Sequence, residues 1–440
     1  MTDQSLPQFV DDDMPATAVR PAIRGAARAS TEAVAPPAER KLTFLRTLDK
    51  PLLVIVSMLL MTGVVMVFSA TFDWSLIEFG SETAVLVQHA RNVGIGLAVM
   101  VIFSALDVRI VRRLSVVIML LAISFLIAVL MFGDDTFGAR RALIAGRFQP
   151  GEFSELAMII YMSAWLSSKQ RRVSSFTAGL LPFVMLVTIV IALVVLQPDF
   201  STALVIVIST SVMFFMAGAD MRQVGIILLV LVVGWFVTRP FMPAYVTDRL
   251  DRFDSSLTIT DPMMVDYHTR QALIAFFSGG WTGVGLGESR QKFLALPAAH
   301  TDSIFAVIGE ELGVVGASGV VLLYVALVMR GLQIAWRASD SYRMLLAAGV
   351  TIWIAAKAIL NIAVIVALIP FTGLPLPFIS FGGSSLVVLM VGVGLLLSVQ
   401  RDTIIRQNSP ERRKPLAHHD YSGRDRRARV SRAGHSGGDG

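Results

Sequence analysis

The chain has no cysteine and few charged side chains. None of its 440 residues is a cysteine, which excludes disulfide bonds, thiolate catalysis and metal sites built on cysteine. Only 16% of the residues are charged, whereas 55% are hydrophobic and the mean hydropathy is +0.68. This balance lies outside the range of soluble globular proteins and predicts an all-α polytopic membrane protein.

The charged residues that are present gather at the two ends. Residues 1–45 combine an acidic run with alanine, proline and arginine, and they contain no apolar run that could act as a cleaved signal. Residues 401–440 are polar and rich in arginine. We predict disordered cytoplasmic tails over 1–45 and 401–440, on either side of a transmembrane domain at 46–400. Their basic charge suits the cytoplasmic leaflet of a membrane better than nucleic acid.

Ten apolar runs are long enough to cross the ~30 Å of a bilayer's hydrocarbon core. Ten helices would put both ends of the chain on one side, with a long extracytoplasmic loop over 240–302 between helices 7 and 8. The short connections rich in lysine and arginine fall on the side of the chain ends, which makes that side cytoplasmic. The runs begin near Pro51, Val87, Leu114, Phe153, Phe176, Ser201, Gln223, Ser303, Met344 and Ser384.

Two basic segments run against this charge bias. Arg140 and Arg141 follow the third helix on the outer side, and the 240–302 loop carries Arg290 and Lys292. Such charge is expected to serve a function, for example contact with an anionic substrate. For the 240–302 loop the alternative is equally open, because long translocated loops escape the charge rule and several aspartates neutralise this one.

The segment Gly283–Gly319 passes from a basic loop into an apolar helix. Small residues recur in this helix at spacings of three and four, which predicts a narrow stripe for close packing in lipid. The stripe consists of Ala306, Gly309, Gly313 and Gly316. Glu310 would lie ~12 Å deeper than Asp302, where an ionisable group normally points into a bundle or a wet cavity.

The acid at the start of this helix has two interpretations of equal weight. A carboxylate at the mouth of a helix bundle, next to His300 and the basic loop, suits catalysis on an anionic substrate. Alternatively, Thr301, Asp302 and Ser303 only cap the helix N-terminus, where an acid also suits the helix dipole.

Other polar features are predicted on the outer side. In the segment 197–203, QPDFSTA, a proline and an aspartate interrupt two apolar runs, and Asp199 can cap the next helix. The segment 373–385, GLPLPFISFGGSS, favours a rigid loop that re-enters the bundle and holds phosphate or sugar oxygens, although a simple tight connection explains it as well. Lys357 and Asn361 are further polar groups at bilayer depth.

Long motifs in register over about residues 50–400 resemble the SEDS family of FtsW, RodA and SpoVE, and among these FtsW most. The motifs are GARR, QPGEF, QPDFSTA, GVGLGESRQK, LPAAHTDSIFAVIGEELG and NIAVIVALIPFTGLPLPFISFGGSS. The resemblance implies a ten-helix glycosyltransferase of the bacterial inner membrane that polymerises lipid II into peptidoglycan strands. It also implies work with a class B penicillin-binding protein and other division proteins, at the division septum.

The resemblance assigns site residues by position. Asp302 matches the family's essential aspartate, in its HTD motif. The other residues that match family motifs are Arg140, Arg141, Gln149, Glu152, Gln197, Asp199 and Lys292. The remaining substrate-binding candidates, from the basic loop, the HTD motif and the segment 373–385, are Arg290, His300, Ser380 and Ser384.

The chain also departs from the family pattern. Glu155 stands where a lysine is usual and Lys357 where a glutamine is frequent, and these two exchanges of charge inside the bundle are expected to compensate each other. The other departures are Ala142, Gly151, His268 and Ala298. They affect the surroundings of the site more than the reaction.

The implied reaction joins the 4-hydroxyl of a GlcNAc on lipid II to the anomeric carbon of a lipid-linked chain, expelling polyprenyl pyrophosphate. A hydroxyl that attacks an oxocarbenium-like centre needs a base, and Asp302 is the candidate, with inversion at the attacked carbon. Arg140, Arg141 and Lys292 would offset the charge of the leaving group, with a divalent cation, Mg²⁺ or Mn²⁺, as a further option. No spacing of metal ligands identifies a site for that cation.

A second class of function also fits broken helices and charges within the membrane: a flippase or transporter of lipid II or another polyprenyl-linked sugar. The ionisable groups crowd the outer side, whereas a transporter is expected to hold its substrate near the midplane. This placement favours the glycosyltransferase. The long polar tails favour a role in division over elongation.

Overall fold

The computed structural model describes residues 47–133, 135–136, 139–140, 149–169, 172–239, 247, 251, 267–294 and 296–407. These residues all belong to one compact unit. The predicted tail over 1–45 and the part of the second tail beyond residue 407 lie outside the described residues. The second tail was predicted to begin at residue 401, but helix continues to Gln407.

Within the described residues, ten helices correspond to the ten apolar runs. They are α2 (Lys50–Phe79), α3 (Ala84–Ala105), α4 (Val108–Phe132), α5 (Pro150–Lys169), α6 (Leu181–Val195), α7 (Phe200–Met216), α8 (Met221–Thr238), α12 (Ile304–Trp336), α13 (Ser341–Ile365) and α14 (Ser384–Gln407). A π-helical turn, η2 (Phe176–Leu180), leads into α6. Seven of the described helices are long and apolar enough to cross a membrane. The all-α polytopic class is confirmed, and the count of ten spans stays a prediction.

The predicted loop over 240–302 contains helices of its own. These are α10 (Tyr267–Ser278) and the single turn α11 (Gln291–Leu294). The segment 240–266, except for Thr247 and Asp251, lies outside the described residues. After the third predicted span, β1 (Asp135–Thr136) pairs antiparallel with β2 (Ala139–Arg140), with Asp135 opposite Arg140.

Aspartates start four of the helices. The carboxylates of Asp49, Asp107, Asp199 and Asp340 each accept a hydrogen bond from a backbone N–H in the first turn of α2, α4, α7 and α13, at 2.8–3.2 Å. Each bond satisfies an amide that the helix itself leaves without a partner. The predicted cap of α7 by Asp199 is confirmed.

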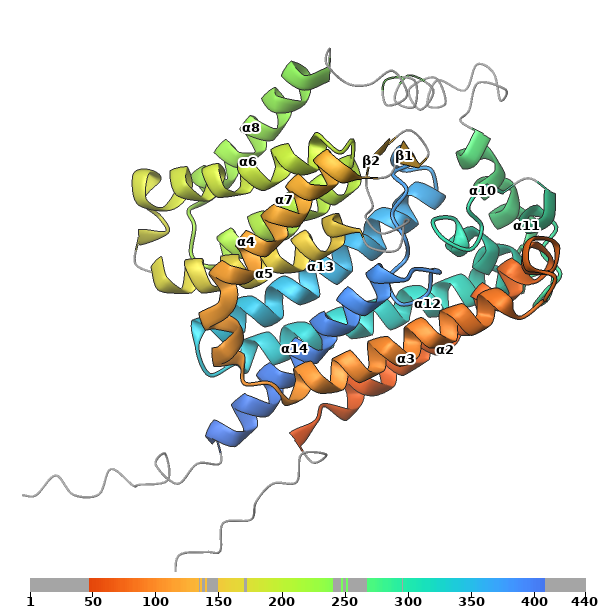
Figure 1. Ribbon diagram of the computed structural model, residues 1–440, viewed down its shortest axis with the longest axis horizontal. Coiled ribbons are helices and arrows are strands. Elements are labelled where there is room, and N and C mark those ends of the chain that lie inside the picture. The colour runs from red at the N-terminus through yellow and green to blue at the C-terminus, as the bar shows by residue number, and fades with distance from the viewer. Residues whose placement is uncertain are drawn as a thin grey trace, which may run out of the picture. The chain divides into compact units, whose positions relative to one another are not determined.

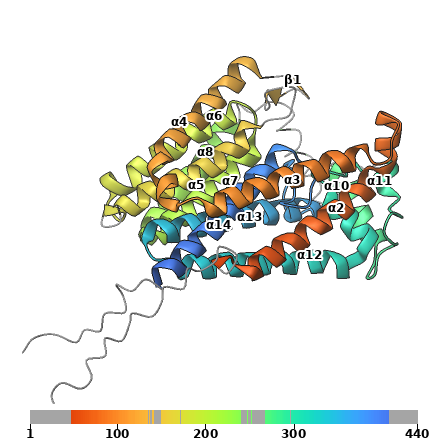
Figure 2. The same ribbon diagram turned by 60° about the horizontal axis from the view of Figure 1, so that its bottom comes forward.

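The helix α13 lies at the centre of the bundle. It packs against α12 and α14 on one side and against α5 and α7 on the other, while α3 runs along α14 (Figures 1 and 2). Its side chains are mostly buried, including the lysine and asparagine at bilayer depth, Lys357 and Asn361. In contrast, α8 projects away from the bundle beyond α7 and exposes leucines, valines and Phe236, as expected of a helix that faces lipid (Figure 1).

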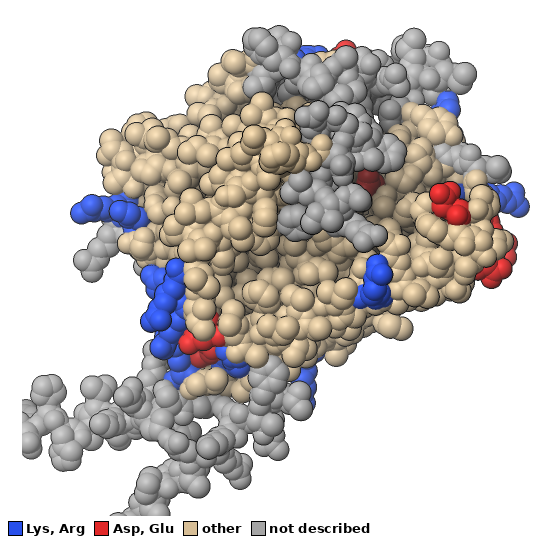
Figure 3. All heavy atoms as spheres, in the orientation of Figure 1, with Lys and Arg blue, Asp and Glu red and all other residues tan. Residues whose placement is uncertain are grey.

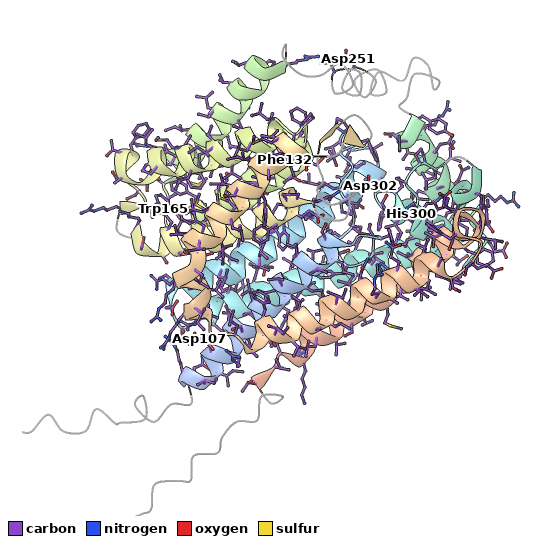
Figure 4. All side chains as sticks on the ribbon, in the orientation of Figure 1. Asp107, Phe132, Trp165, Asp251, His300 and Asp302 are labelled. Carbon is purple, nitrogen blue, oxygen red and sulfur yellow. The ribbon has the colours of Figure 1, made fainter. Side chains whose placement is uncertain are left out.

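The two ends of the bundle differ in charge and in the residues that they carry. In Figure 1, α2 begins and α14 ends at the same end, and Figure 3 shows lysine and arginine side chains gathered there. This agrees with the predicted cytoplasmic face. Figure 4 shows Asp107 at this end and Asp302 near the other, so the candidate catalytic residue lies on the predicted outer side.

The helix α12 is broken at Gly313, and a neighbouring segment fills the break. Gly313 has φ 67° and ψ −170°, and a side chain there would meet the carbonyl oxygen of Trp281 at 2.5 Å, so only glycine fits. Four hydrogen bonds of 3.0–3.1 Å join the segment 280–285 to the break. They run from Val284 N to Glu310 O, from Gly285 N to Glu311 O, from Val314 N to Gly280 O and from Val315 N to Trp281 O.

The stripe of small residues on α12 meets α10 and this inserted segment. A Cβ on Gly309 would lie 2.4 Å from the ring of Phe276 in α10, and a Cβ on Gly279 would lie 2.0 Å from the carbonyl oxygen of Gly309. The predicted close packing is therefore present, but its partner comes from the loop between α8 and α12 rather than from another long helix.

Candidate active site

The loop between α13 and α14 re-enters the bundle and is fastened to the start of α12. The side-chain amide of Asn361 donates to the carbonyl oxygens of Asp302 and Leu374, at 2.8 and 2.6 Å. The hydroxyl of Ser380 donates to the carbonyl oxygen of Thr301 at 2.5 Å and accepts from the backbone N–H of Leu376 at 2.8 Å. The predicted re-entry of the loop is confirmed, and Ser380 is one of the groups that hold it.

A row of aromatic rings supports the residue pair His300 and Asp302, which Figure 4 shows close together. The His300 ring stacks on Trp74 of α2, with centroids 5.0 Å apart, and lies edge-on to Phe381, whose backbone N–H donates to the His300 carbonyl oxygen at 2.9 Å. Burial lowers the pKa of His300 below its ordinary 6.5, so the ring is neutral at pH 7.

The segment before α12 is built differently from a simple helix cap. Ser303 occupies the N-cap position, but its side chain makes no capping hydrogen bond, and the hydroxyl of Thr301 donates to the carbonyl oxygen of Ala298. The Asp302 carboxylate faces the re-entering loop, because a Cβ added to Gly373 would lie 3.5 Å from its Oδ2 atom. Ser303 therefore does not cap α12, and the capping role of Asp302 stays an alternative.

Gly373 also lines a cavity of about 60 Å³ at the outer ends of the helices. The volume is well below the ~300–1,000 Å³ of typical ligand sites, so the cavity admits only part of a sugar. Among its lining side chains are two carboxylates and one ammonium group. The lining residues are Gln149, Gly151, Glu152, Asp199, Thr202, Lys357, Gly373, Leu374 and Pro375.

A buried ion pair forms the wall of this cavity. The Lys357 ammonium of α13 donates to Glu155 Oε2 of α5 at 2.9 Å and lies 3.9 Å from Glu152 Oε1. The indole N–H of Trp353 donates to the same Glu155 oxygen at 2.7 Å, and the hydroxyl of Ser384 donates to Glu152 at 3.2 Å. The expectation that the Glu155 and Lys357 exchanges compensate each other is confirmed by this contact.

A second buried cluster lies beside the break in α12. The Lys292 ammonium donates to Glu311 Oε1 at 2.7 Å, to the Gly287 carbonyl oxygen at 2.7 Å and to the Ser69 hydroxyl at 3.1 Å. Ser69 of α2 in turn donates to Glu311 at 2.6 Å. These three acceptors use all three N–H groups of the ammonium, so a substrate would have to displace one of them.

Glu310 bonds to the loop that follows the inserted segment 280–285. Its carboxylate accepts from the Ser289 hydroxyl at 2.5 Å and from the backbone N–H of Arg290 at 3.0 Å. The predicted buried position is correct, and the group serves to close the loop that carries Arg290. The guanidinium-bearing side chain of Arg290 is exposed.

The structure brings some of the predicted site residues together and separates others. Gln149, Glu152 and Asp199 line the cavity, with Ser384 bonded to Glu152 and Asp302 beside Gly373. The Gln197 amide donates instead to the Leu126 carbonyl oxygen of α4, at 3.0 Å. For Arg140 only the backbone in β2 is described, and Arg141 lies outside the described residues.

Four residues of the two clusters and of the aromatic row were not predicted. Trp353 lies one helical turn before Lys357 on the same face, so its spacing was a usable signal. Ser69, Trp74 and Glu311 meet their partners across long stretches of chain, and no local pattern marks them. Among the residues that the structure describes, no group of three or more histidine, aspartate and glutamate side chains is arranged to hold a metal ion.

Comparison with known proteins agrees with this architecture. The family model described as Cell cycle protein, which covers FtsW, RodA and SpoVE, matches residues 50–404. The chain therefore belongs to the FtsW/RodA/SpoVE family, the SEDS family. Its resemblance extends over nearly the whole described bundle.

Individual relatives share this length. Stage V sporulation protein E of Bacillus subtilis (strain 168) is 36% identical over 368 residues, which cover 82% of this chain and 99% of that protein. The probable peptidoglycan glycosyltransferase FtsW of Trichlorobacter lovleyi is 34% identical over 360 residues, covering 80% and 92%. A chain from a structure of a peptidoglycan synthase complex that coordinates polymerization and crosslinking superposes with a TM-score of 0.66 at 26% identity, covering 81% and 98%.

Proposed function

We propose that this protein is a peptidoglycan glycosyltransferase of the FtsW type, which polymerises lipid II into glycan strands. The observation that carries the proposal is the position of Asp302. Its carboxylate lies on the predicted outer side, beside the re-entering loop and a cavity lined by Glu152, Asp199 and Lys357. Membership of the family and the names of its FtsW relatives supply the substrate class.

Asp302 acts in this proposal as the general base. It takes the proton of the acceptor's 4-hydroxyl while the oxygen attacks the anomeric carbon of the lipid-linked chain, and the bond to the polyprenyl pyrophosphate breaks on the opposite face. Because the hydroxyl attacks from the face opposite the leaving pyrophosphate, the configuration at the anomeric carbon is inverted. The fixed loop contributes by orientation, because Asn361 holds the backbone of Asp302 and of Leu374 at once.

The leaving pyrophosphate requires positive charge outside the cavity. The cavity lining carries more carboxylates than ammonium groups, so a diphosphate is repelled from its interior. Arg140 and Arg141, which the charge pattern predicts on the outer side, and the exposed Arg290 are the proposed contacts. Binding of Mg²⁺ or Mn²⁺ stays a prediction, and among the described residues no group of three or more acidic or histidine side chains is arranged to hold such an ion.

The proposed setting is the bacterial inner membrane at the division septum, with both termini cytoplasmic. The proposed partner is a class B penicillin-binding protein, whose transpeptidase activity would crosslink the strands made here. The related chain in the solved peptidoglycan synthase complex supports a partnership of this kind.

The decisive experiment compares Asp302→Asn with wild type in lipid II polymerisation by purified protein in detergent, with and without the penicillin-binding partner. Loss of one charge without a change of volume is expected to lower the rate by ~10²–10⁴-fold, the usual contribution of general-base catalysis. Asp107→Asn, at the other end of the bundle, keeps its capping role and is the matched control.

Polymer formation by Asp302→Asn at the wild-type rate would remove the base from the mechanism. A wild-type protein that makes no polymer but moves fluorescent lipid II across proteoliposome membranes would instead be a transporter, the runner-up function.

A further inference from the structure

The buried ammonium of Lys357 is incompletely bonded. Its side chain is 1% exposed, and among the described residues it makes one hydrogen bond, to Glu155 Oε2. Glu152 Oε1 lies at 3.9 Å, beyond hydrogen-bond distance, and the Trp353 ring lies 5.6 Å from the ammonium nitrogen. An ammonium group has three N–H donors, so two remain for another acceptor.

The acceptor side of the pair is incomplete as well. Glu155 Oε1 is buried, and the described residues offer it no hydrogen-bond partner, whereas Oε2 accepts from both Lys357 and Trp353. Buried charges normally have every donor and acceptor satisfied, because an unsatisfied one costs the full loss of hydration. The pair therefore has the form of a site that a ligand completes.

The cavity decides where that ligand lies. Lys357 is a lining residue, so its free donors have an open volume beside them, and Glu155, at 1% exposure, sits behind it as a counter-ion. Glu152 and Asp199, the other charged lining residues, are both acidic. They repel a diphosphate and suit neutral groups with hydroxyls, while the ammonium suits an oxygen that accepts.

We propose that Lys357 binds a neutral oxygen of the substrate, a hydroxyl or an acetamido carbonyl of the sugar that enters the cavity, and that Glu155 is the positioning residue that keeps the ammonium charged and in place. This assignment rests on the proposed function. It deepens that function by giving the cavity to the sugar and leaving the pyrophosphate outside.

The test uses paired substitutions that keep the buried site neutral. Glu155→Gln with Lys357→Met removes both charges and all donors of the lysine at nearly constant volume. Glu155→Gln with Lys357→Gln is equally neutral but keeps an N–H₂ donor on the same side, one bond nearer the backbone than the lysine nitrogen. The matched control is Asp49→Asn with Arg330→Gln, which neutralises a pair of 2.7 Å at the cytoplasmic end, far from the cavity.

Steady-state polymerisation of lipid II by the full chain in detergent, with thermal unfolding of each variant, distinguishes binding from structure. The Met double variant is expected to raise KM by roughly ten- to a hundredfold, the effect of losing one charged hydrogen bond, with kcat nearly unchanged. The Gln double variant is expected to raise KM less than the Met double variant does, because an amide can still donate. The control pair is expected to leave KM at the wild-type value.

A KM within twofold of wild type in the Met double variant would overturn the proposal and make the pair structural. If that variant does not fold, the Gln double variant decides, and an unchanged KM overturns the proposal in the same way. Wild-type protein is assayed in parallel, so a failure of the proposed function itself appears as absence of polymer in every sample.

Discussion

Two buried lysine–glutamate pairs lie near the outer end of this molecule, and they are built in opposite ways. In the pair Lys292–Glu311, of 2.7 Å, every N–H of the ammonium has an acceptor, and Ser69 bonds the carboxylate as well. In the pair Lys357–Glu155, of 2.9 Å, the described residues leave donors and one carboxylate oxygen without partners. The first pair is closed and the second is open.

The difference indicates what each pair does. Removing two charges from water costs several kcal/mol per ion, and mutual attraction offsets this only when further hydrogen bonds complete the site. A closed pair meets that condition by itself. It fastens α11, which carries Lys292, to α2 and α12. An open pair beside a cavity meets it only with a ligand, so the bonding state of a buried lysine separates a structural from a functional role.

The largest expected effect comes from breaking the closed pair. Lys292→Met leaves Glu311 as an uncompensated buried charge, and it is expected to lower the free energy of unfolding by ~3–5 kcal/mol, measured in detergent micelles. Addition of Glu311→Gln should restore most of this loss, because the charge is then gone. A single variant as stable as wild type would show that the closed pair is not structural.

The same double variant addresses the predicted contact of Lys292 with substrate. A wild-type KM for lipid II in Lys292→Met with Glu311→Gln would show that Lys292 holds α11 in place and does not contact the substrate. A raised KM in a stable double variant would mean that the closed pair opens during the reaction, and the contrast between the two pairs would weaken.

The next effect concerns the break in α12 at Gly313, two residues after Glu311 of the closed pair. Gly313→Ala forces a side chain into φ 67°, ψ −170° and against the Trp281 carbonyl, so we expect a loss of ~2–3 kcal/mol in the free energy of unfolding. Gly319→Ala is the control, since a Cβ there meets no atom within 4 Å. Equal stability of the two variants would contradict the need for glycine at the break.

A smaller effect is expected at the open pair. Ser384→Ala removes the hydroxyl that donates to Glu152 at 3.2 Å and leaves the carboxylate in the cavity wall, so kcat/KM for lipid II should fall about two- to tenfold, the value of one hydrogen bond. Ser398→Ala removes a hydroxyl further along α14, at the cytoplasmic end, and should leave kcat/KM unchanged. A similar loss of kcat/KM in both variants would show that the effect comes from a disturbed α14 and not from the cavity wall.

The smallest effect is a dependence of stability on pH through His300, which stacks on Trp74. Its pKa is lower in the folded than in the unfolded protein because of burial, so the folded state binds fewer protons. Stability is then complete above the unfolded pKa of about 6.5 and decreases as pH falls through it, by under ~1 kcal/mol between pH 7 and pH 6. His300→Gln should reduce this slope by the share that His300 contributes, and an unchanged slope would exclude His300 as a contributor.

Much of the fold was predictable because a bilayer imposes length and hydropathy on each helix. The predicted starts at Phe176 and Ser384 coincide with the first residues of η2 and α14. The largest difference is at α4, which was predicted to begin near Leu114 and begins at Val108. The break at Gly313 was not predicted, since Gly313 also fitted a regular stripe of small residues. Its actual reason is a contact with Trp281, a partner that periodicity within α12 does not reveal.

The site was predictable where a motif or a paired departure marked it. Asp302 and Asp199 stand in recognisable motifs, and the double exchange at Glu155 and Lys357 pointed to a contact between α5 and α13. The bonds of Lys292 were not predictable, because its acceptors Ser69 and Glu311 come from distant parts of the chain.

The broken helix has a consequence for how the protein is made. In a lipid environment the amides and carbonyls freed around Gly313 have no water to bond, and the segment 280–285 is what satisfies them. That segment precedes α12 along the chain, so it leaves the ribosome first and is available when α12 enters the bilayer. Synthesis in the native order thus delivers the partner before the helix that depends on it, and a permuted chain that began with α12 would expose bare backbone to lipid until its last residues were made.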